Sequence, residues 1–203
     1  MKKYIVTLLI SALILPCFAQ KDAQAKKILD ETSAAFAKAG GIKATFRIKS
    51  GGNQINGVLQ LKNRKFFLDT NDATTWFDGK TQWSYLKHSE EVNISLPTED
   101  ELQSMNPYAL LNIYKNGYNY KLNGVVGNNY KITLTPENKK KAFSRIVLLI
   151  SKSNYQPQHI TLEQPNNNSE ITITSYKTKQ SYSDSLFQFN KKKYPNAEII
   201  DLR

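Results

Sequence analysis

The sequence predicts a mainly β fold of the α+β class, arranged as one antiparallel meander rather than as alternating strands and helices. Much of the chain alternates apolar and polar side chains with a period of two, which is typical of strands that have one buried face. Turn signals rich in Gly, Asn, Asp and Pro separate these runs at short spacings. About ten strands are expected, accompanied by roughly two or three helices.

The N-terminus has the features of a secretory signal peptide over residues 1–19. Lysines precede an apolar run that is too short to span a bilayer as a stable helix. The pattern Cys17-Phe18-Ala19 places small residues at the expected positions, so we expect cleavage after Ala19 and a single domain over residues 20–203. The product would contain no cysteine, which excludes disulfides and thiol chemistry from it.

Cys17 leaves one alternative open. A signal that ends in cysteine can be lipidated at that residue, which would anchor the protein to a membrane. Such a site prefers a small residue before the cysteine, whereas here Pro16 restricts the backbone that the peptidase must hold extended. We therefore favour a soluble product.

The chain is basic, with 28 Lys and Arg residues against 17 Asp and Glu residues and a net charge of +11. Removal of Lys2 and Lys3 leaves 26 basic residues and a net charge of +9. Nucleic-acid binding fits badly with export, and the lysines are scattered along strand faces or gathered in short runs such as 191–193. A weak attraction to anionic head groups or to an acidic partner is the class of interaction that this charge favours.

An amphipathic helix is predicted over residues 22–38. Its apolar positions recur at helical spacing, and the glycine pair that follows provides a C-terminal stop. The residues on the apolar face are Ile28, Leu29, Thr32, Ala35 and Phe36. A second, short apolar helix over residues 108–115 is predicted from Asn106-Pro107, with Asn as the cap and Pro at the first position.

Strands are predicted wherever the alternation is clear. Glycine pairs and the dipeptide Asp78-Gly79 mark the tightest hairpins. The predicted strands are 42–49, 55–62, 64–69, 74–77, a strand containing Trp83 and Tyr85, 92–96, 118–122, 129–135, 144–152, 159–164 and 171–177. Phe187 and Phe189 are expected to close the sheet.

Nothing in the sequence predicts an enzyme. His88 and His159 lie on different predicted strands without metal-ligand spacing, and phosphate-binding glycine loops or nucleophile motifs are absent. Neighbouring acids such as Glu90-Glu91 would point to opposite faces of a strand, which makes them poor partners in acid–base catalysis. We expect no catalytic residue, no metal site and no cofactor.

One face of the predicted sheet is wide and apolar, and the few helices would cover it incompletely. Such a sheet can curl into a partial barrel whose interior is a hydrophobic cavity. Candidate lining residues are Phe46, Leu59, Phe66, Trp83, Val92, Ile132, Leu148 and Ile173. The alternation alone is equally consistent with side chains that fill the interior as an ordinary core.

The chain resembles the LolA family of periplasmic carriers, which take lipoproteins from the inner to the outer membrane of Gram-negative bacteria. The similar stretches follow the N-terminal helix in order and cover nearly the whole mature chain. They are KATFRI, GVLQLKNRKFFLDT, FDGKTQWSYLKHSEEVNI, NPYALLNIY, NYKITLTPE, IVLLISKSNYQPQHITL and YPNAEIIDL. The most specific combination is DGKTQW, then a polar–apolar strand, then a short helix that starts with proline.

The resemblance implies an unclosed antiparallel half-barrel with helices forming a lid over an apolar cavity that holds acyl chains. The implied ligand-binding residues of cavity and lid are Phe46, Leu59, Phe66, Leu68, Trp83, Tyr85, Leu110, Ile113 and Leu148. The implied partners are acylated lipoproteins, an inner-membrane lipoprotein-releasing ABC transporter and, where present, an outer-membrane acceptor. The implied protein is a monomeric, non-enzymatic carrier of the periplasm.

One residue of the family pattern is only partly matched. In the family an arginine beside a proline latches the lid by donating hydrogen bonds to helix carbonyls. The corresponding sequence here is LKNRKFFLD, in which Arg64 is present but the proline is absent. Asn63 could occupy the latch position instead. The alternative for Arg64 is a solvated charge at the end of a strand.

Two other functions on the same scaffold remain open at this stage. One is a membrane-anchored lipoprotein acceptor, which a lipid on Cys17 would support. The other is a periplasmic lipid-binding or regulatory sensor protein with a different guest.

Overall fold

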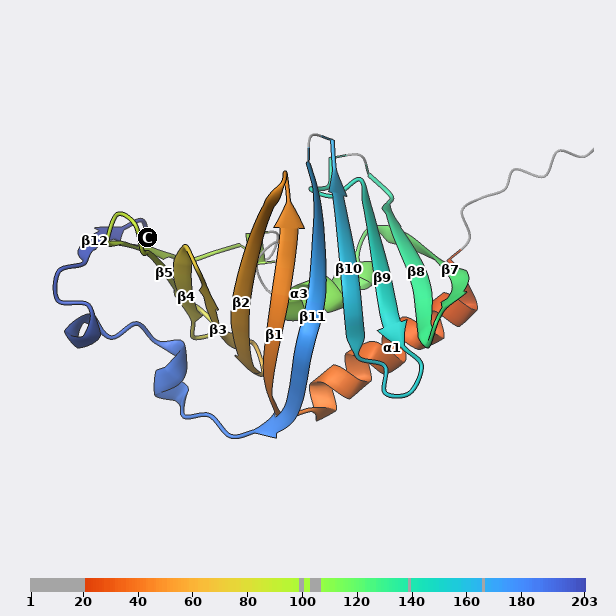
Figure 1. Cartoon of the computed structure of the whole chain (residues 1–203), viewed down its shortest axis with the longest axis horizontal. Coiled ribbons are helices and arrows are strands. Elements are labelled where there is room, and N and C mark those ends of the chain that lie inside the picture. Colours follow the sequence, from red (N-terminus) through yellow and green to blue (C-terminus); the bar gives the residue numbers. More distant parts are fainter. Residues whose placement is uncertain (1–20, 99–100, 103–106, 139, 166) are drawn as a thin grey trace, which may run out of the picture.

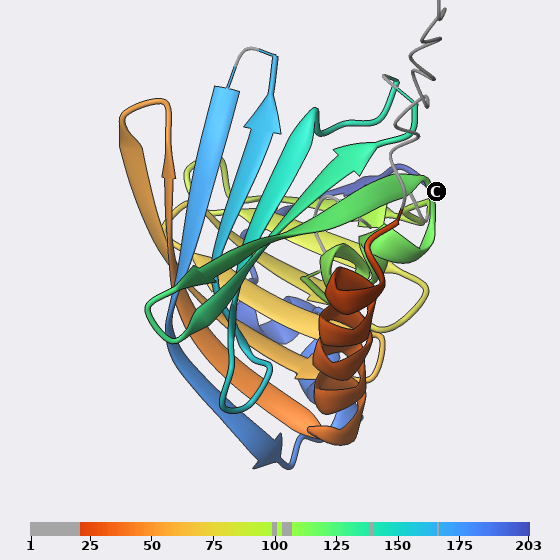
Figure 2. The same ribbon diagram turned by 90° about the vertical axis from the view of Figure 1, so that its right-hand side faces the viewer.

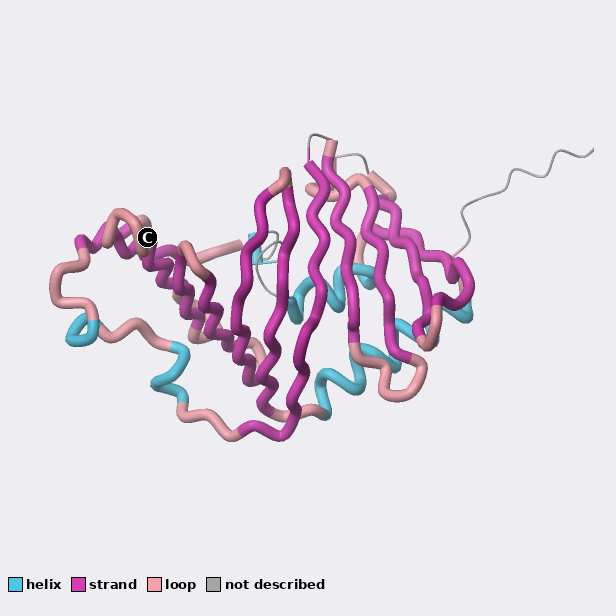
Figure 3. The backbone as a smooth tube through the Cα atoms, in the orientation of Figure 1, coloured by secondary structure: helices cyan, strands magenta, loops and turns pink. Residues whose placement is uncertain are grey.

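The computed structural model describes residues 21–98, 101–102, 107–138, 140–165 and 167–203. The predicted signal peptide with Cys17, and the predicted cap Asn106, lie outside these residues. Twelve strands form one sheet that stays open, with β12 at one edge and β7 at the other. The helices α1 and α3 lie on one face of this sheet (Figures 1 and 3).

Strand positions agree closely with the alternation in the sequence. The strands are β1 (Gly41–Ser50), β2 (Asn53–Lys62), β3 (Lys65–Thr70), β4 (Ala73–Phe77), β5 (Gln82–Leu86), β6 (Glu91–Ser95), β7 (Tyr118–Val126), β8 (Asn129–Pro136), β9 (Arg145–Ser151), β10 (Pro157–Gln164), β11 (Asn167–Gln180) and β12 (Glu198–Asp201). The helical elements are α1 (Ala23–Lys38), α3 (Pro107–Asn112) and the 3₁₀ turns η1 (Ile113–Lys115), η2 (Asp184–Phe187) and η3 (Lys191–Lys193).

Both predicted helices are present, with small differences at their ends. Asp22 is the N-cap of α1 rather than its first residue, because its carboxylate accepts hydrogen bonds from the backbone N–H groups of Gln24 and Ala25. Gly40 ends this helix with a positive φ of 69°, which glycine adopts without a steric cost. The central helix begins at Pro107 and tightens from Ile113 into the 3₁₀ turn η1.

Sheet order follows chain order along each half, and β1 pairs with β11 to join the halves. The prediction of an entirely antiparallel sheet is wrong at one edge, since β12 pairs with β6 in parallel. After β11 the chain crosses the outside of strands β3–β6 (Figure 1) and reaches β6 from the same end at which β6 itself begins. The prediction that Phe187 and Phe189 close the sheet is also wrong, because Phe187 lies in η2 and β12 forms the edge.

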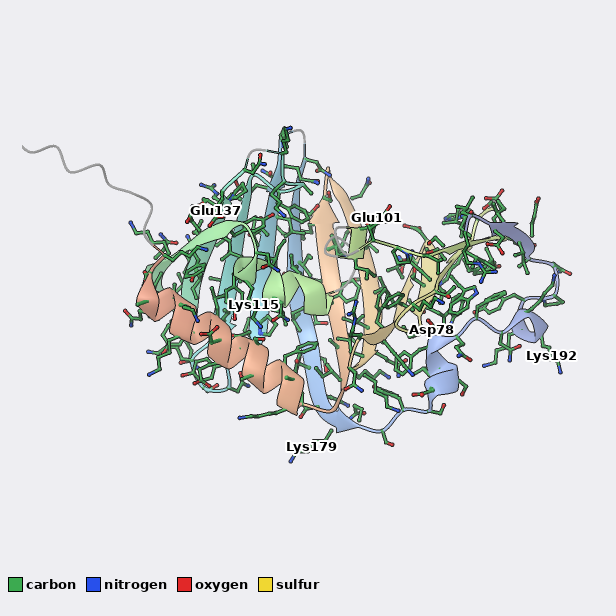
Figure 4. The ribbon with its side chains drawn as sticks, turned by 180° about the vertical axis from the view of Figure 1, so that it is seen from behind. Asp78, Glu101, Lys115, Glu137, Lys179 and Lys192 are labelled. Atoms are coloured by element: carbon green, nitrogen blue, oxygen red, sulfur yellow. The ribbon has the colours of Figure 1, made fainter. Side chains whose placement is uncertain are left out.

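Two core clusters fill the space between the sheet and the helices. In the first, α1, α3 and η1 pack on β7–β10. In the second, the C-terminal half of α1 and Leu111 of α3 pack on β1–β4. Figure 4 views this side and shows α1 and α3 in front of the strands from β7 to β1 in sheet order, while the wing, defined here as β3–β6 with β12, extends beyond them.

A third cluster lies on the opposite face of the wing, and Figure 2 shows how the sheet curves between the two sides. Trp76 is 5% exposed and packs edge-on against the rings of Phe189 and Tyr194, at centroid distances of 5.5 and 5.6 Å. Tyr85 and Tyr194 are 4.7 Å apart by the same measure, and Val92 is fully buried beside them. The segment between β11 and β12 therefore covers the outer face of the wing as a helix would cover a sheet.

The sheet register shows that the buried face changes side within the wing. Cross-strand partners point to the same face, so each pairing extends a row across the sheet. On the helix side, the first row is Ala44, Leu59, Leu68, Thr75, Ser84 and Asn93. The second row is Ile42, Leu61, Phe66, Phe77, Gln82 and Ser95. On the outer side one row is Gln60, Phe67, Trp76, Trp83 and Ile94. Both helix-side rows change from apolar to polar as the outer row becomes aromatic.

Trp76→Ala should lower the free energy of unfolding by about 3–5 kcal/mol, because it removes a large buried side chain and leaves a cavity. It should also loosen the C-terminal segment, so that trypsin cleaves faster under native conditions at the lysines of η3, which are exposed but lie in a folded turn. Leu68→Ala, on the opposite face, is the control and should cost stability while leaving η3 protected. Equal trypsin cleavage in both variants would show that Trp76 does not hold the segment.

Candidate functional site

The candidate site is the apolar, helix-covered face of the sheet. Seven of the nine predicted cavity and lid residues belong to this face or its cover: Phe46, Leu59, Phe66, Leu68, Leu110, Ile113 and Leu148. All of them are buried except Leu68, which is half-buried. Ile132 and Ile173, also proposed as lining, lie in or against the same two clusters.

Trp83 and Tyr85 do not join this group. Trp83 pairs with Trp76 and Ile94, and Tyr85 pairs with Thr74 and Val92, which places all of them on the outer face of the wing. Trp83, Tyr85 and Val92 therefore pack with the C-terminal segment and do not line the same surface as Phe66. These three residues are part of the core on the outer face and do not line the helix-covered face.

Close packing defines the apolar face near β1 and β2. The ring of Phe46 lies over Gly57, its cross-strand partner, where a Cβ atom would approach the ring to 2.3 Å. Glycine is therefore needed at position 57 for this ring to contact the sheet so closely. Phe66 and Phe77 continue the surface, with ring centroids 5.4 Å apart.

Polar contacts join α1 to α3 and η1. The Ser33 hydroxyl donates to Oδ1 of Asn112 at 2.8 Å, and the Tyr114 hydroxyl donates to Oδ1 of Asp30 at 2.7 Å. Asp30 also accepts a hydrogen bond from Lys26, which is the main reason that the pKa of this carboxyl is lowered. Burial, reinforced by the bond to Asp30, raises the pKa of Tyr114. The helical elements are thus linked to each other as one cover.

One residue attaches this cover to the sheet edge. Oδ2 of Asp22 accepts a hydrogen bond from the N–H of Leu122 in β7 at 2.9 Å, while its backbone N–H donates to the carbonyl of Tyr120. The N–H groups of Leu122 and Ala25 are the leading causes that lower the pKa of Asp22. A helix that begins at Asp22 leaves this capping role unpredicted, although an Asp before an apolar helical run is a capping signal.

Arg64 lies at the opposite end of α1. It is exposed and lines a cleft of about 160 Å³ with Phe36, Ala37, Gly40, Leu61 and Asn63, between the last turn of α1 and the β2–β3 turn. Asn63 has a φ of 56° and occupies the first position of this two-residue turn. The geometry therefore places Arg64, a side chain with five N–H donors, beside the carbonyl end of the helix.

The histidines lie apart from this region. His88 is exposed, with Nε2 3.5 Å from the Asp72 carboxylate, and His159 shares a 3.1 Å hydrogen bond with Thr172. Within the part of the chain that the structure describes, no group of three His, Cys, Asp or Glu side chains could hold a metal ion. Across the same residues, no helix has the length and apolarity required to cross a bilayer.

The fold is an open, curved sheet of twelve strands whose apolar face lies beneath the helical elements α1, α3 and η1. Residues 15–166 match the model of the outer membrane lipoprotein carrier protein LolA family, and the chain belongs to that family. No curated protein matches the sequence.

One solved structure shares the fold at low sequence identity, and two others are more distantly similar. An uncharacterized conserved protein from Thermus thermophilus is 15% identical, with a TM-score of 0.64 over 88% of this chain and 99% of that chain. A LolA superfamily protein from Nitrosomonas europaea is 10% identical, with a TM-score of 0.47 over 81% and 97%. A chain of the MucA/MucB complex of Pseudomonas aeruginosa is 13% identical, with a TM-score of 0.46 over 83% and 62%.

Asp22→Ala should lower the free energy of unfolding by about 1 kcal/mol through loss of the helix cap, with a further loss from the bond to Leu122. Because folding lowers the pKa of Asp22, its contribution is present above the unfolded pKa and is lost as pH falls. Urea unfolding should therefore show a difference between wild type and variant that shrinks below about pH 4. Glu31→Ala, an exposed α1 carboxylate, is the control and should show neither effect.

Proposed function

We propose that this protein is a periplasmic carrier that binds the acyl chains of lipoproteins between its helices and its sheet and takes them from the inner to the outer membrane. The observation that carries the proposal is the apolar face shared by the two helix-side clusters, which in this member of the family packs, among the described residues, against α1, α3, η1 and Leu102. The comparisons support the family. That the guest is an acyl chain is our inference from the apolar surface on the helix side of the sheet.

Energetics favour a cover that opens. Each methylene removed from water contributes about 0.8 kcal/mol, so one long acyl chain gains on the order of 10 kcal/mol from an apolar site. The apolar side chains on the helix side are already buried against one another, so a guest must replace contacts between cover and sheet. The exchange of one apolar contact for another makes both uptake and release thermodynamically accessible.

The structure offers a way for the cover to move as a unit. α1 is joined to α3 and η1 through Ser33 and Asp30, and its N-terminus is attached to β7 through Asp22. The other end of α1 borders the cleft that contains Arg64. We propose that the cover opens at this end, with Arg64 as a latch that holds the last turn of α1 when the site is empty.

In the full proposal, an inner-membrane lipoprotein-releasing ABC transporter supplies the guest and an outer-membrane acceptor, where present, receives it. The chain from residue 20 onward would be the working form, after cleavage of residues 1–19. A mass spectrum of the N-terminus of the exported protein tests this part, because a lipid on Cys17 would indicate the membrane-anchored acceptor instead.

A release assay tests the carrier. Residues 20–203 added to energised spheroplasts should bring lipoproteins into the soluble fraction in complex with the protein, as identified by mass spectrometry. A variant with Ala37→Cys and Asn63→Cys, joined across the α1 cleft by a short bis-maleimide, should lose this activity because the cover cannot open. Each single cysteine variant treated with the same reagent is the control. Undiminished release by the linked protein would refute opening at this end.

Arg64→Ala should leave the cover more loosely closed. We expect faster uptake of a fluorescent acyl probe in stopped flow and faster hydrogen exchange in the last turn of α1, with a loss of at most about 1 kcal/mol in stability because the side chain is exposed. Lys80→Ala, on the exposed β4–β5 turn, is the matched control. Unchanged uptake and exchange in Arg64→Ala would leave Arg64 as a solvated charge.

A further inference from the structure

The helix-side face of the wing is polar where the rest of that face is apolar. Continuing the two rows beyond Leu68 and Phe77, the register places five uncharged polar residues next to one another on β4, β5 and β6. We define this group as the hydroxyl–amide strip: Thr75, Gln82, Ser84, Asn93 and Ser95. The strip is therefore the lateral continuation of the apolar surface proposed to hold the acyl chains.

Four members of the strip, Thr75, Ser84, Asn93 and Ser95, retain hydrogen-bonding capacity. Thr75 and Ser84 contact each other at 3.4 Å, and Nε2 of Gln82 donates to the Ser84 hydroxyl at 3.3 Å, which are both long for hydrogen bonds. Within the described residues, the side chains of Asn93 and Ser95 make no hydrogen bond. Thr75, Ser84, Asn93 and Ser95 are half-buried, so a bound group could reach them.

The charges beside the strip select the chemistry of such a group. Glu91 pairs with Glu198 in the parallel register of β6 and β12, on the same face as Asn93 and at the end of the strands next to the β5–β6 turn. Among the described residues, strands β4, β5, β6 and β12 direct no Lys, Arg or His to this face. Two adjacent carboxylates without a cation disfavour a carboxylate or phosphate head group.

We propose that the hydroxyl–amide strip binds the amide and ester groups at the acylated end of a lipopeptide, while its acyl chains occupy the neighbouring apolar face. This inference rests on the proposed carrier function and specifies its guest. Amide and ester groups are uncharged and offer carbonyl acceptors and N–H donors. In a lipopeptide they lie directly beside the acyl chains, just as each row of the sheet passes from apolar residues to the polar residues of the strip. A free fatty acid or an anionic phospholipid would place a negative charge beside Glu91 and Glu198.

The rows explain why this surface is specific to the helix side. The outer face of the wing is aromatic and is covered by the C-terminal segment. The polar residues of the wing therefore lie on its helix-side face, which continues the apolar surface of β1–β3. The described helices α1 and α3 lie over the strands from β7 to β1 (Figure 4), and the clusters beneath them include Phe66 of β3 and Phe77 of β4 but no residue of β5, β6 or β12. A guest that extends from under the cover toward the wing would thus meet apolar side chains first and the strip second.

The test compares two probes: a dipalmitoylated lipopeptide with an uncharged peptide part, and palmitate. The strip variant carries Thr75→Val, Ser84→Ala and Asn93→Leu. The control variant carries the same types of change on the outward face of β1, β11 and β2, namely Thr45→Val, Ser175→Ala and Asn56→Leu. Dissociation constants are measured by titration calorimetry after circular dichroism and thermal unfolding confirm the fold.

The strip variant should bind the lipopeptide roughly tenfold more weakly than wild type, through loss of two or three neutral hydrogen bonds, and palmitate equally well. The control variant should bind both probes as wild type does. Wild-type affinity of the strip variant for the lipopeptide, or an equal loss for both probes, overturns the proposal. If wild type binds neither probe, the carrier function itself fails; if it binds palmitate alone, only the lipopeptide assignment fails.

A second variant keeps the proposal testable if the first does not fold. Glu91→Gln with Glu198→Gln removes both carboxylates and the repulsion between them, so it should not reduce stability. We expect it to bind palmitate several-fold more tightly than wild type and the uncharged lipopeptide equally well. Unchanged affinity for palmitate would show that the carboxylates do not select the head group.

Discussion

The two faces of a single sheet are buried against different covers, and this constraint arranges the rest of the molecule. Strands β1–β3 and β7–β11, with Phe77 of β4, bury the face that α1 and α3 cover, whereas β5 and β6 bury the opposite face beneath the segment between β11 and β12. Neither cover could bury the apolar residues of both halves, because these residues lie on opposite faces of the sheet. The long path of the chain after β11 follows from this requirement.

Local patterns in the sequence were sufficient to predict most of the elements. The helical spacing from Ile28 to Phe36 and the glycines after it are sufficient to predict the position of α1. The same holds for β1 and β2, where alternation and the Gly51-Gly52 turn agree with the observed register. These features depend on backbone preferences and on the burial of one face. A buried face appears in the sequence as apolar residues with a period of two in a strand or 3.6 in a helix.

The side to which each strand directs its apolar residues could not be predicted in the same way. Alternation gives a period but no absolute direction, so Trp83 and Phe66 were assigned to one surface although they lie on opposite faces. A signal for the change was nevertheless present. Phe66-Phe67-Leu68 and Trp76-Phe77 interrupt the alternation with consecutive apolar residues, which is expected of strands that are buried on both faces. The edge strand β12 was missed because its pairing depends on a long-range contact.

The division of the sheet also bears on how a carrier could bind firmly and still release its guest. A surface that was apolar throughout would hold an acylated guest by area alone, and every additional methylene would slow release. Here the apolar area ends at Leu68 and Phe77, and the polar residues beyond it contribute only what hydrogen bonds gain over water, which is modest for uncharged groups. Affinity would then come from the covered face and orientation from the wing. In the proposed carrier, a guest oriented in this way would leave by the opening of one cover, without any rearrangement of the wing that the C-terminal segment holds in place.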